Sequence, residues 1–230
     1  MLTEFEIQAI SLSLKVAFSA VSFSLPLAIV TAWILARGNF YAKPLLDAIV
    51  HLPLVLPPVV IGYLLLIGFS QQGIIGAWLI EYLSVDISFS WQGAALASAI
   101  VAFPLMVRAI KLSIEAVDSK LEQAASTLGA SPFKVFFTIT LPLIVPGILS
   151  GVILAFARSL GEFGATITFV SNIPELTRTI PLAMYSFIQT PGAEQQALRL
   201  CLIAIGIALI ALIGSYSLEQ KMRRRIAHQH

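Results

Sequence analysis

Long apolar windows constrain this chain more than any other feature of its sequence. A helix needs about 20 mostly apolar residues to cross the hydrocarbon core of a bilayer. Five windows approach or exceed this length: Val16–Leu35, Ile49–Phe69, Trp91–Val107, Leu141–Ala157 and Leu200–Tyr216. We therefore expect an all-α integral membrane protein, a bundle of about five transmembrane helices.

The composition indicates that lipid is the main solvent of the chain. Of the 230 residues, 58% are hydrophobic and 11% are charged, whereas soluble domains average roughly 45–50% and about 25%. The windows and their flanks leave too few residues for a separate soluble domain of about 100 residues. Residues 1–230 are thus expected to form a single transmembrane domain.

Several function classes lack the residues that they need. A net charge of +2 is too small to indicate nucleic acid binding, and no glycine-rich phosphate loop of the Walker type appears. Cys201 is the single cysteine, and His51 has no second ligand at metal spacing. We expect no metal site and no cofactor bound by this chain, and no set of residues for intramembrane enzyme chemistry.

Basic residues predict how the helices are oriented, because Lys and Arg accumulate on the cytoplasmic side of a membrane. Ten of the 14 basic residues share one side: Arg37, Lys43, Arg108, Lys111, Lys120, Lys134, Lys221, Arg223, Arg224 and Arg225. The other four are Lys15, Arg158, Arg178 and Arg199. The N-terminus is therefore expected outside and the C-terminus in the cytoplasm. Because Glu4 and Glu6 precede any basic residue, the first window reads as a retained helix and not as a cleaved signal.

The most polar segment between windows, residues 108–140, is then cytoplasmic. Ser119 and Glu122 have the spacing of a capping box and Gly129 is a usual stop, which predicts a short helix over Lys120–Leu128. Its apolar residues recur at helical spacing: Leu121, Ala124, Ala125 and Leu128. Alanines bury little area in lipid but let another backbone approach, so docking into a partner's groove is favoured. The alternative is a helix that lies on the bilayer surface.

A second helix is expected to follow the first directly. Ser131 is a suitable cap, and Pro132 suits a first turn. This helix would carry Phe133, Phe136 and Phe137 on one side and run into the fourth apolar window.

Three regions are expected to depart from straight spans. Pro53, Pro57 and Pro58 interrupt the second window and Pro104 the third, and because proline removes a helical hydrogen bond, we expect a bend at these positions. Between residues 158 and 197, the apolar pieces Phe163–Val170 and Ile180–Ile188 are too short to cross a bilayer. Such pieces are typical of partial or re-entrant helices, which protein or water must surround.

Polar residues near the outer end of the fourth window are candidates for a path or gate. Arg158 and Glu162 are four residues apart on one expected helix face, either as an ion pair at the membrane edge or beside a path for an anion. Thr166, Thr168 and Ser171 could donate hydroxyl hydrogen bonds to an anion. They could equally serve packing or bond to backbone.

The cytoplasmic segment resembles a signature of importer permeases of the ATP-binding cassette (ABC) class. That signature has the triplet Glu-Ala-Ala, three residues, Gly, nine residues, Ile, one residue, and Leu-Pro. Every spacing matches at Gln123–Ala125, Gly129, Ile139, Leu141 and Pro142. Gln123 stands where the signature has Glu, and Glu122 precedes it, which leaves open which side chain makes the family's polar contact.

The resemblance implies a type I ABC importer permease fold in a bacterial inner membrane. The segment would be a coupling helix that inserts into a separate ATPase subunit, which would bind the ATP and Mg²⁺. Partners would be a second copy of the chain, two ATPase subunits and a periplasmic binding protein. The coupling residues implied are Leu121, Glu122, Gln123, Ala124, Ala125, Leu128, Gly129, Ile139, Leu141 and Pro142.

Longer passages are similar to the molybdate branch of this family, with sulfate permeases as near relatives. They are His51–Leu66, Phe103–Ile110 and Phe156–Tyr185. The implied function is a non-enzymatic permease for molybdate, with sulfate or tungstate as alternative substrates. An autonomous secondary anion transporter is the alternative class, although the centres of the windows lack the ionisable residues that it would use for coupling. The last passage resembles the outer gate region of oxyanion permeases, and it contains the candidate path or gate residues Arg158, Glu162, Thr166, Thr168 and Ser171.

Overall fold

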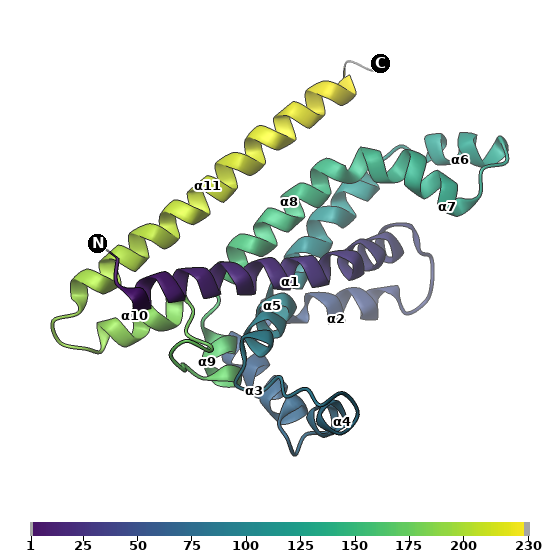
Figure 1. Ribbon diagram of the computed structural model, residues 1–230. Helices are drawn as coiled ribbons and strands as arrows, with labels where there is room; N and C mark the ends of the chain where they lie inside the picture. Colours follow the sequence, from purple (N-terminus) through teal and green to yellow (C-terminus); the bar gives the residue numbers. More distant parts are fainter. Residues whose placement is uncertain (1, 228–230) are drawn as a thin grey trace.

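All regular structure in the described residues is helical (Figure 1). The computed structural model describes residues 2–227, and for residue 215 and residues 218–227 the backbone alone. The elements are α1 (Glu4–Arg37), α2 (Lys43–Val55), α3 (Pro58–Phe69), α4 (Ile74–Leu83), α5 (Trp91–Glu115), α6 (Ser119–Thr127), α7 (Pro132–Val135), the π-helix η1 (Phe136–Thr140), α8 (Leu141–Leu160), α9 (Gly164–Val170), α10 (Ile180–Ile188) and α11 (Glu194–Ala227).

Within residues 2–227, four helical segments are long and apolar enough to cross a membrane. They are α1, α5, the run Pro132–Leu160 that ends in α8, and Glu194–Gly214 of α11. Helices α2 and α3 pass the same test only as a pair. The expected number of about five spans is confirmed when this pair is counted as one.

The second span is broken and not merely bent. Helices α2 and α3 meet at 110°, where Pro57 precedes α3 and Pro58 is its first residue. Neither proline has a backbone N–H to donate to the preceding turn, and each ring crowds that turn. Pro53 lies inside α2 without ending it. The break therefore falls at the proline pair.

The centre of the bundle is formed by α1, α5 and α8. Small residues such as Ala28, Ala32, Ala102 and Ala155 are buried there beside larger aliphatic side chains. A Cβ added at Gly147 of α8 would lie 2.2 Å from Ser113 Cβ of α5. Close backbone approach of this kind is how membrane helices associate, because lipid offers no hydrophobic driving force between them.

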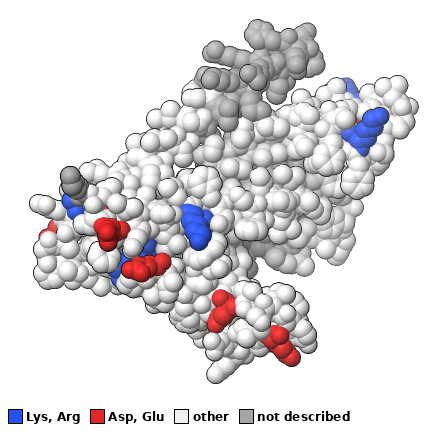
Figure 2. All heavy atoms as spheres, in the orientation of Figure 1, with Lys and Arg blue, Asp and Glu red and all other residues white. Residues whose placement is uncertain are grey.

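The bundle has two different ends. Figure 1 shows α6 and α7 at one end, beyond the inner ends of α1, α5 and α8, and α4, α9 and α10 toward the other. In Figure 2 a wide uncharged band separates the two ends, with mainly Lys and Arg visible at the α6–α7 end. The positive charge places α6 and α7 in the cytoplasm. The basic side chains from Lys221 onward lie outside the described side chains.

Candidate functional site

The cytoplasmic segment begins with α6, whose start differs from the predicted one. Asp118 is the N-cap, and its carboxylate accepts a hydrogen bond from the Lys120 backbone N–H at 2.9 Å. The predicted capping box of Ser119 and Glu122 is wrong, since Ser119 is already the first helical residue. A carboxylate at this position also interacts favourably with the positive end of the helix dipole.

The end of α6 confirms the predicted stop. Gly129 follows the C-cap residue Leu128 and has φ of +83°. A left-handed residue at this position satisfies the last carbonyl groups of a helix and turns the chain away from its axis.

The implied coupling residues in and next to α6 lie largely in the open. None of the residues of α6 is buried, Gln123 and Ala124 are exposed, and Leu121 and Leu128 are 45% and 89% exposed. This is an amphipathic helix whose apolar side faces away from its own bundle, which is the arrangement expected of a docking helix.

The segment after Gly129 confirms the second predicted start but not an unbroken α-helix. Ser131 caps α7, accepting from the Lys134 N–H at 3.4 Å, and Pro132 occupies its first turn. The π-helix η1 then replaces the expected continuous helix up to α8, and the Leu141 N–H bonds to the Phe136 carbonyl. Of the remaining signature residues, Ile139 is half-buried in η1, Leu141 packs against the core, and Pro142 is exposed in the first turn of α8.

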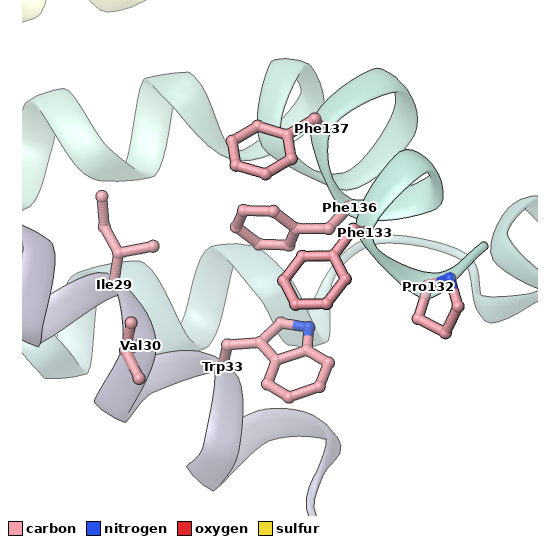
Figure 3. A pocket seen from close by; sticks show the side chains of 7 residues that line it. All are labelled: Ile29, Val30, Trp33, Pro132, Phe133, Phe136 and Phe137. Carbon is pink, nitrogen blue, oxygen red and sulfur yellow. The ribbon is translucent and has the colours of Figure 1, made fainter.

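The phenylalanine side chains predicted to share one face line an apolar groove. Phe133, Phe136 and Phe137 lie across from Trp33 of α1, together with Ile29, Val30 and Pro132, around about 380 Å³ (Figure 3).

Glu122, which directly precedes the signature triplet, is the coupling residue that turns toward the bundle. Its Oε1 accepts a hydrogen bond from Thr140 Oγ1 at 2.7 Å, and its Oε2 lies 3.1 Å from Arg37 Nε in an ion pair. Arg37 Nη2 also donates to the Val117 carbonyl at 3.1 Å. Of the two candidates for a polar contact, Glu122 makes one within the chain, whereas Gln123 is exposed.

Sequence reasoning missed Arg37 and Thr140. Thr140 occupies the unspecified position of the signature, between Ile139 and Leu141. Arg37 is the last residue of α1 and looked like an orientation signal only. The available signals in the sequence were a threonine at the start of one span and an arginine at the end of another.

At the outer end, the predicted ion pair of Arg158 and Glu162 is present at 2.7 Å. The two residues do not share a helix, however, because α8 ends at Leu160. Glu162 lies in the link to α9, and its Oε1 accepts the Ala165 N–H at 2.8 Å. Its side chain is 1% exposed against 32% for Arg158. The carboxylate therefore stabilises the start of α9, while one-third of the Arg158 side chain stays accessible.

The hydroxyl groups near this pair bond to backbone in this structure. Thr166 Oγ1 donates to the Phe163 carbonyl and Thr168 Oγ1 to the Gly164 carbonyl, each at 2.9 Å. A hydroxyl has a single proton to donate, so neither is directed at an anion here. Ser171 is exposed with φ of +64°, and its carbonyl accepts from Thr177 Oγ1 at 3.1 Å.

The partial helices α9 and α10 confirm the two short apolar pieces expected in this region. Helix α9 rests on the broken span: a Cβ added at Gly62 of α3 would lie 2.5 Å from the Ala165 carbonyl. The loop between α9 and α10 is held by Asn172, which donates to Ser186 Oγ at 2.7 Å and accepts from Arg178 Nε at 3.0 Å. The outer region is thus ordered by its own polar contacts.

Helices that span a membrane, partial helices at the outer end and an exposed amphipathic helix at the cytoplasmic end define the class of membrane transport permeases. The chain belongs to the family described as "Binding-protein-dependent transport system inner membrane component", whose sequence pattern matches residues 24–224. It is therefore an inner membrane transport subunit and not an enzyme.

The names of proteins similar to this chain agree with this family assignment. The molybdenum transport system permease protein ModB of Haemophilus influenzae is 63% identical, over 96% of this chain and 96% of that protein. The protein of the same name from Escherichia coli K12 is 61% identical, over 97% and 98%. The solved inward-facing MetNI methionine ABC transporter has a chain with a TM-score of 0.75 at 12% identity, over 96% of this chain and 99% of that one, which shows the fold.

Proposed function

We propose that this chain is the permease subunit of an ATP-driven importer and forms the translocation path for molybdate. The observation that supports molybdate as the substrate is the sequence identity of 63% and 61%, over nearly the full length, to molybdenum transport permeases. Residues 1–230 act as one transmembrane domain, with a coupling loop at about 108–140 and an outer gate region at about 158–197.

The exposed side of α6 is the docking surface for a cytoplasmic ATPase subunit, which binds the ATP and Mg²⁺. Leu121 and Leu128 supply the apolar contact, and Ala124 and Ala125 allow close backbone approach. Gly129 lets the chain leave the docking helix sharply. The spacing of Ala124, Ala125 and Gly129 matches the family signature, which supports this assignment.

The path forms between two copies of the chain. Five spans are few to enclose a route through the bilayer, whereas a twofold pair encloses one along its shared interface. Arg158, one-third exposed beside the partial helix α9, attracts the oxyanion. Its pairing with Glu162 keeps that attraction weak, as conduction requires.

Transport proceeds by alternating access. Two ATPase subunits close on ATP, carry the α6 helices with them and turn the cavity outward, where a periplasmic binding protein delivers the anion. Hydrolysis then restores the inward-facing state. A change between inward-facing and outward-facing states needs a partner that binds one state more tightly than the other. The ATPase subunits are this partner, because ATP binding changes which state they favour.

Reconstitution tests this function. The chain, its ATPase subunit and its binding protein are placed in proteoliposomes, and molybdate uptake is measured with and without ATP. We expect molybdate uptake that depends on ATP. Uptake by the chain alone without ATP would contradict the proposal and support a secondary transporter.

A further inference from the structure

The polar cluster of Arg37, Glu122 and Thr140 joins three helices at the cytoplasmic end. The Glu122 carboxylate comes from α6, Arg37 is the last residue of α1, and Thr140 is the last residue of η1 before α8. One carboxylate thus contacts two spans that are far apart in the sequence. We propose that this cluster is the link that transmits movement of α6 to α1 and α8, with Arg37 and Thr140 as positioning residues for transport. The proposal rests on the proposed docking of α6 to an ATPase subunit.

Apolar packing does not hold α6 on the bundle. None of its residues is buried, and its far end leads into Gly129, where the backbone is left-handed and a Cβ would meet nothing within 4 Å. A helix attached in this way can tilt about its ends unless other contacts fix it. Glu122, whose side chain is 20% exposed, supplies those contacts.

The bond to Thr140 connects α6 to the outer region through α8. Thr140 is 1% exposed and its hydroxyl donates to Glu122 at 2.7 Å. Helix α8 follows with 20 residues, or about 30 Å at 1.5 Å per residue. Its last turn carries Arg158, paired with Glu162. Because α8 is one continuous helix between Thr140 and Arg158, it provides the route by which a displacement of Thr140 would reach the outer pair.

The ion pair with Arg37 connects α6 to α1. The guanidinium lies 3.1 Å from Glu122 and also donates to the carbonyl of Val117, which precedes α6. Val117 and Leu35 belong to the buried core. Rotating α6 against α1 would therefore break at least one of the two contacts of Arg37.

Thr140 offers a matched pair of variants with Thr138. Thr138 is exposed, and its hydroxyl donates only to the Lys134 carbonyl of the same segment, at 2.6 Å. Thr140→Val and Thr138→Val each replace one hydroxyl by a methyl group in the same element, but only the first removes a contact to α6. Thr140→Ser, which keeps the hydroxyl, is the conservative variant.

The experiment uses the full complex in proteoliposomes and measures ATP hydrolysed per molybdate imported, together with co-purification of the ATPase subunit. For Thr140→Val we expect undiminished co-purification and a ratio raised at least about tenfold, the lower limit of the factor that corresponds to loss of one hydrogen bond to a charged group. Thr138→Val and Thr140→Ser should stay within about twofold of the wild type. Equal ratios for Thr140→Val and Thr138→Val would overturn the link, and so would loss of co-purification in Thr140→Val, which would assign the hydroxyl to docking.

A second measurement tests whether the contacts act as one link. Arg37→Gln is compared alone and together with Thr140→Val. Contacts within one network are not additive, so the double variant should match the larger single effect, and a product of the two single effects would overturn the proposal. The wild-type complex tests the proposed function separately. If it shows no ATP-dependent uptake, the proposed function is wrong. If it shows uptake but Thr140→Val and Thr138→Val hydrolyse equal amounts of ATP per molybdate imported, only the proposed link is wrong.

Discussion

Glu122 at the cytoplasmic end and Glu162 at the outer end are both paired with an arginine, but they hold different kinds of structure together. Glu162 bonds within its own neighbourhood, to Arg158 and the Ala165 N–H, and is almost completely buried. Glu122 is one-fifth exposed and bonds to residues from two other helices. The pair of Glu162 and Arg158 stabilises the link between α8 and α9, whereas the pair of Glu122 and Arg37 joins helices that have to move together. The outer cluster should thus matter more for stability, and the inner one for coupling.

The largest effect on stability is expected from Arg158→Ala. The substitution leaves the buried Glu162 carboxylate without its counter-charge, and breaking such a pair costs about 3–5 kcal/mol. Thermal unfolding of the purified protein in detergent measures the loss, with the exposed Glu175→Gln as control. A variant as stable as the wild type would show that the outer pair is solvated and that the contrast with Glu122 is false.

Gly129→Val tests the inner region. A β-branched residue at φ of +83° is strained by about 1–3 kcal/mol, so the turn after α6 should rearrange and co-purification of the ATPase subunit should fall more than about tenfold. Gly192→Val is the matched control, because Gly192 has φ of +84° and equally open surroundings in the outer loop. It should lose similar stability but keep the ATPase. Full ATPase binding by Gly129→Val would contradict the docking role of α6.

Leu128→Ser separates docking from stability. Leu128 is 89% exposed, so unfolding should change by no more than about 0.5 kcal/mol. Its apolar side chain is nevertheless expected at the centre of the contact with the ATPase subunit, and truncating one of the few side chains that dominate an interface costs more than about 1 kcal/mol of binding free energy. Titration of the ATPase subunit onto the permease in nanodiscs measures the difference. An unchanged affinity would remove Leu128 from the docking surface.

The smallest effect is expected from Thr168→Val in the outer region. The hydroxyl donates to the Gly164 carbonyl of the same helix, so its loss should cost about 0.5–1.5 kcal/mol and leave the apparent affinity for molybdate uptake within about twofold. A large rise in the molybdate concentration needed for half-maximal uptake would show that this hydroxyl leaves the backbone to bind the anion.

The sequence predicted those elements that depend on neighbouring residues. Apolar length located the spans, Gly129 located the end of α6, and α10 has the bounds Ile180–Ile188 of the apolar piece itself. The proline pair indicated a bend, but its angle of 110° depends on how α3 packs on α9. The cap of α6 was misplaced by one residue because Asp118 and Ser119 are both good caps.

The partners of the two glutamates show the same limit. Arg158 lies four residues from Glu162, so its pairing could be read from spacing. Thr140 lies 18 residues from Glu122, and Arg37 lies farther still. Such contacts depend on which spans pack side by side, and apolar windows do not contain that information.

The π-helix between α7 and α8 gives the spacing of the family signature a geometric meaning. One α-helical residue corresponds to a rotation of about 100°, and η1 contains one residue more than an α-helical turn would use. Phe136 therefore stacks below Leu141, and Phe137 swings outward to 60% exposure. Deleting a single residue from η1 would turn the whole aromatic face, and α6 with it, by more than a quarter of a revolution around α8. The nine residues between Gly129 and Ile139 thus set the direction, around the axis of α8, in which α6 projects from the membrane.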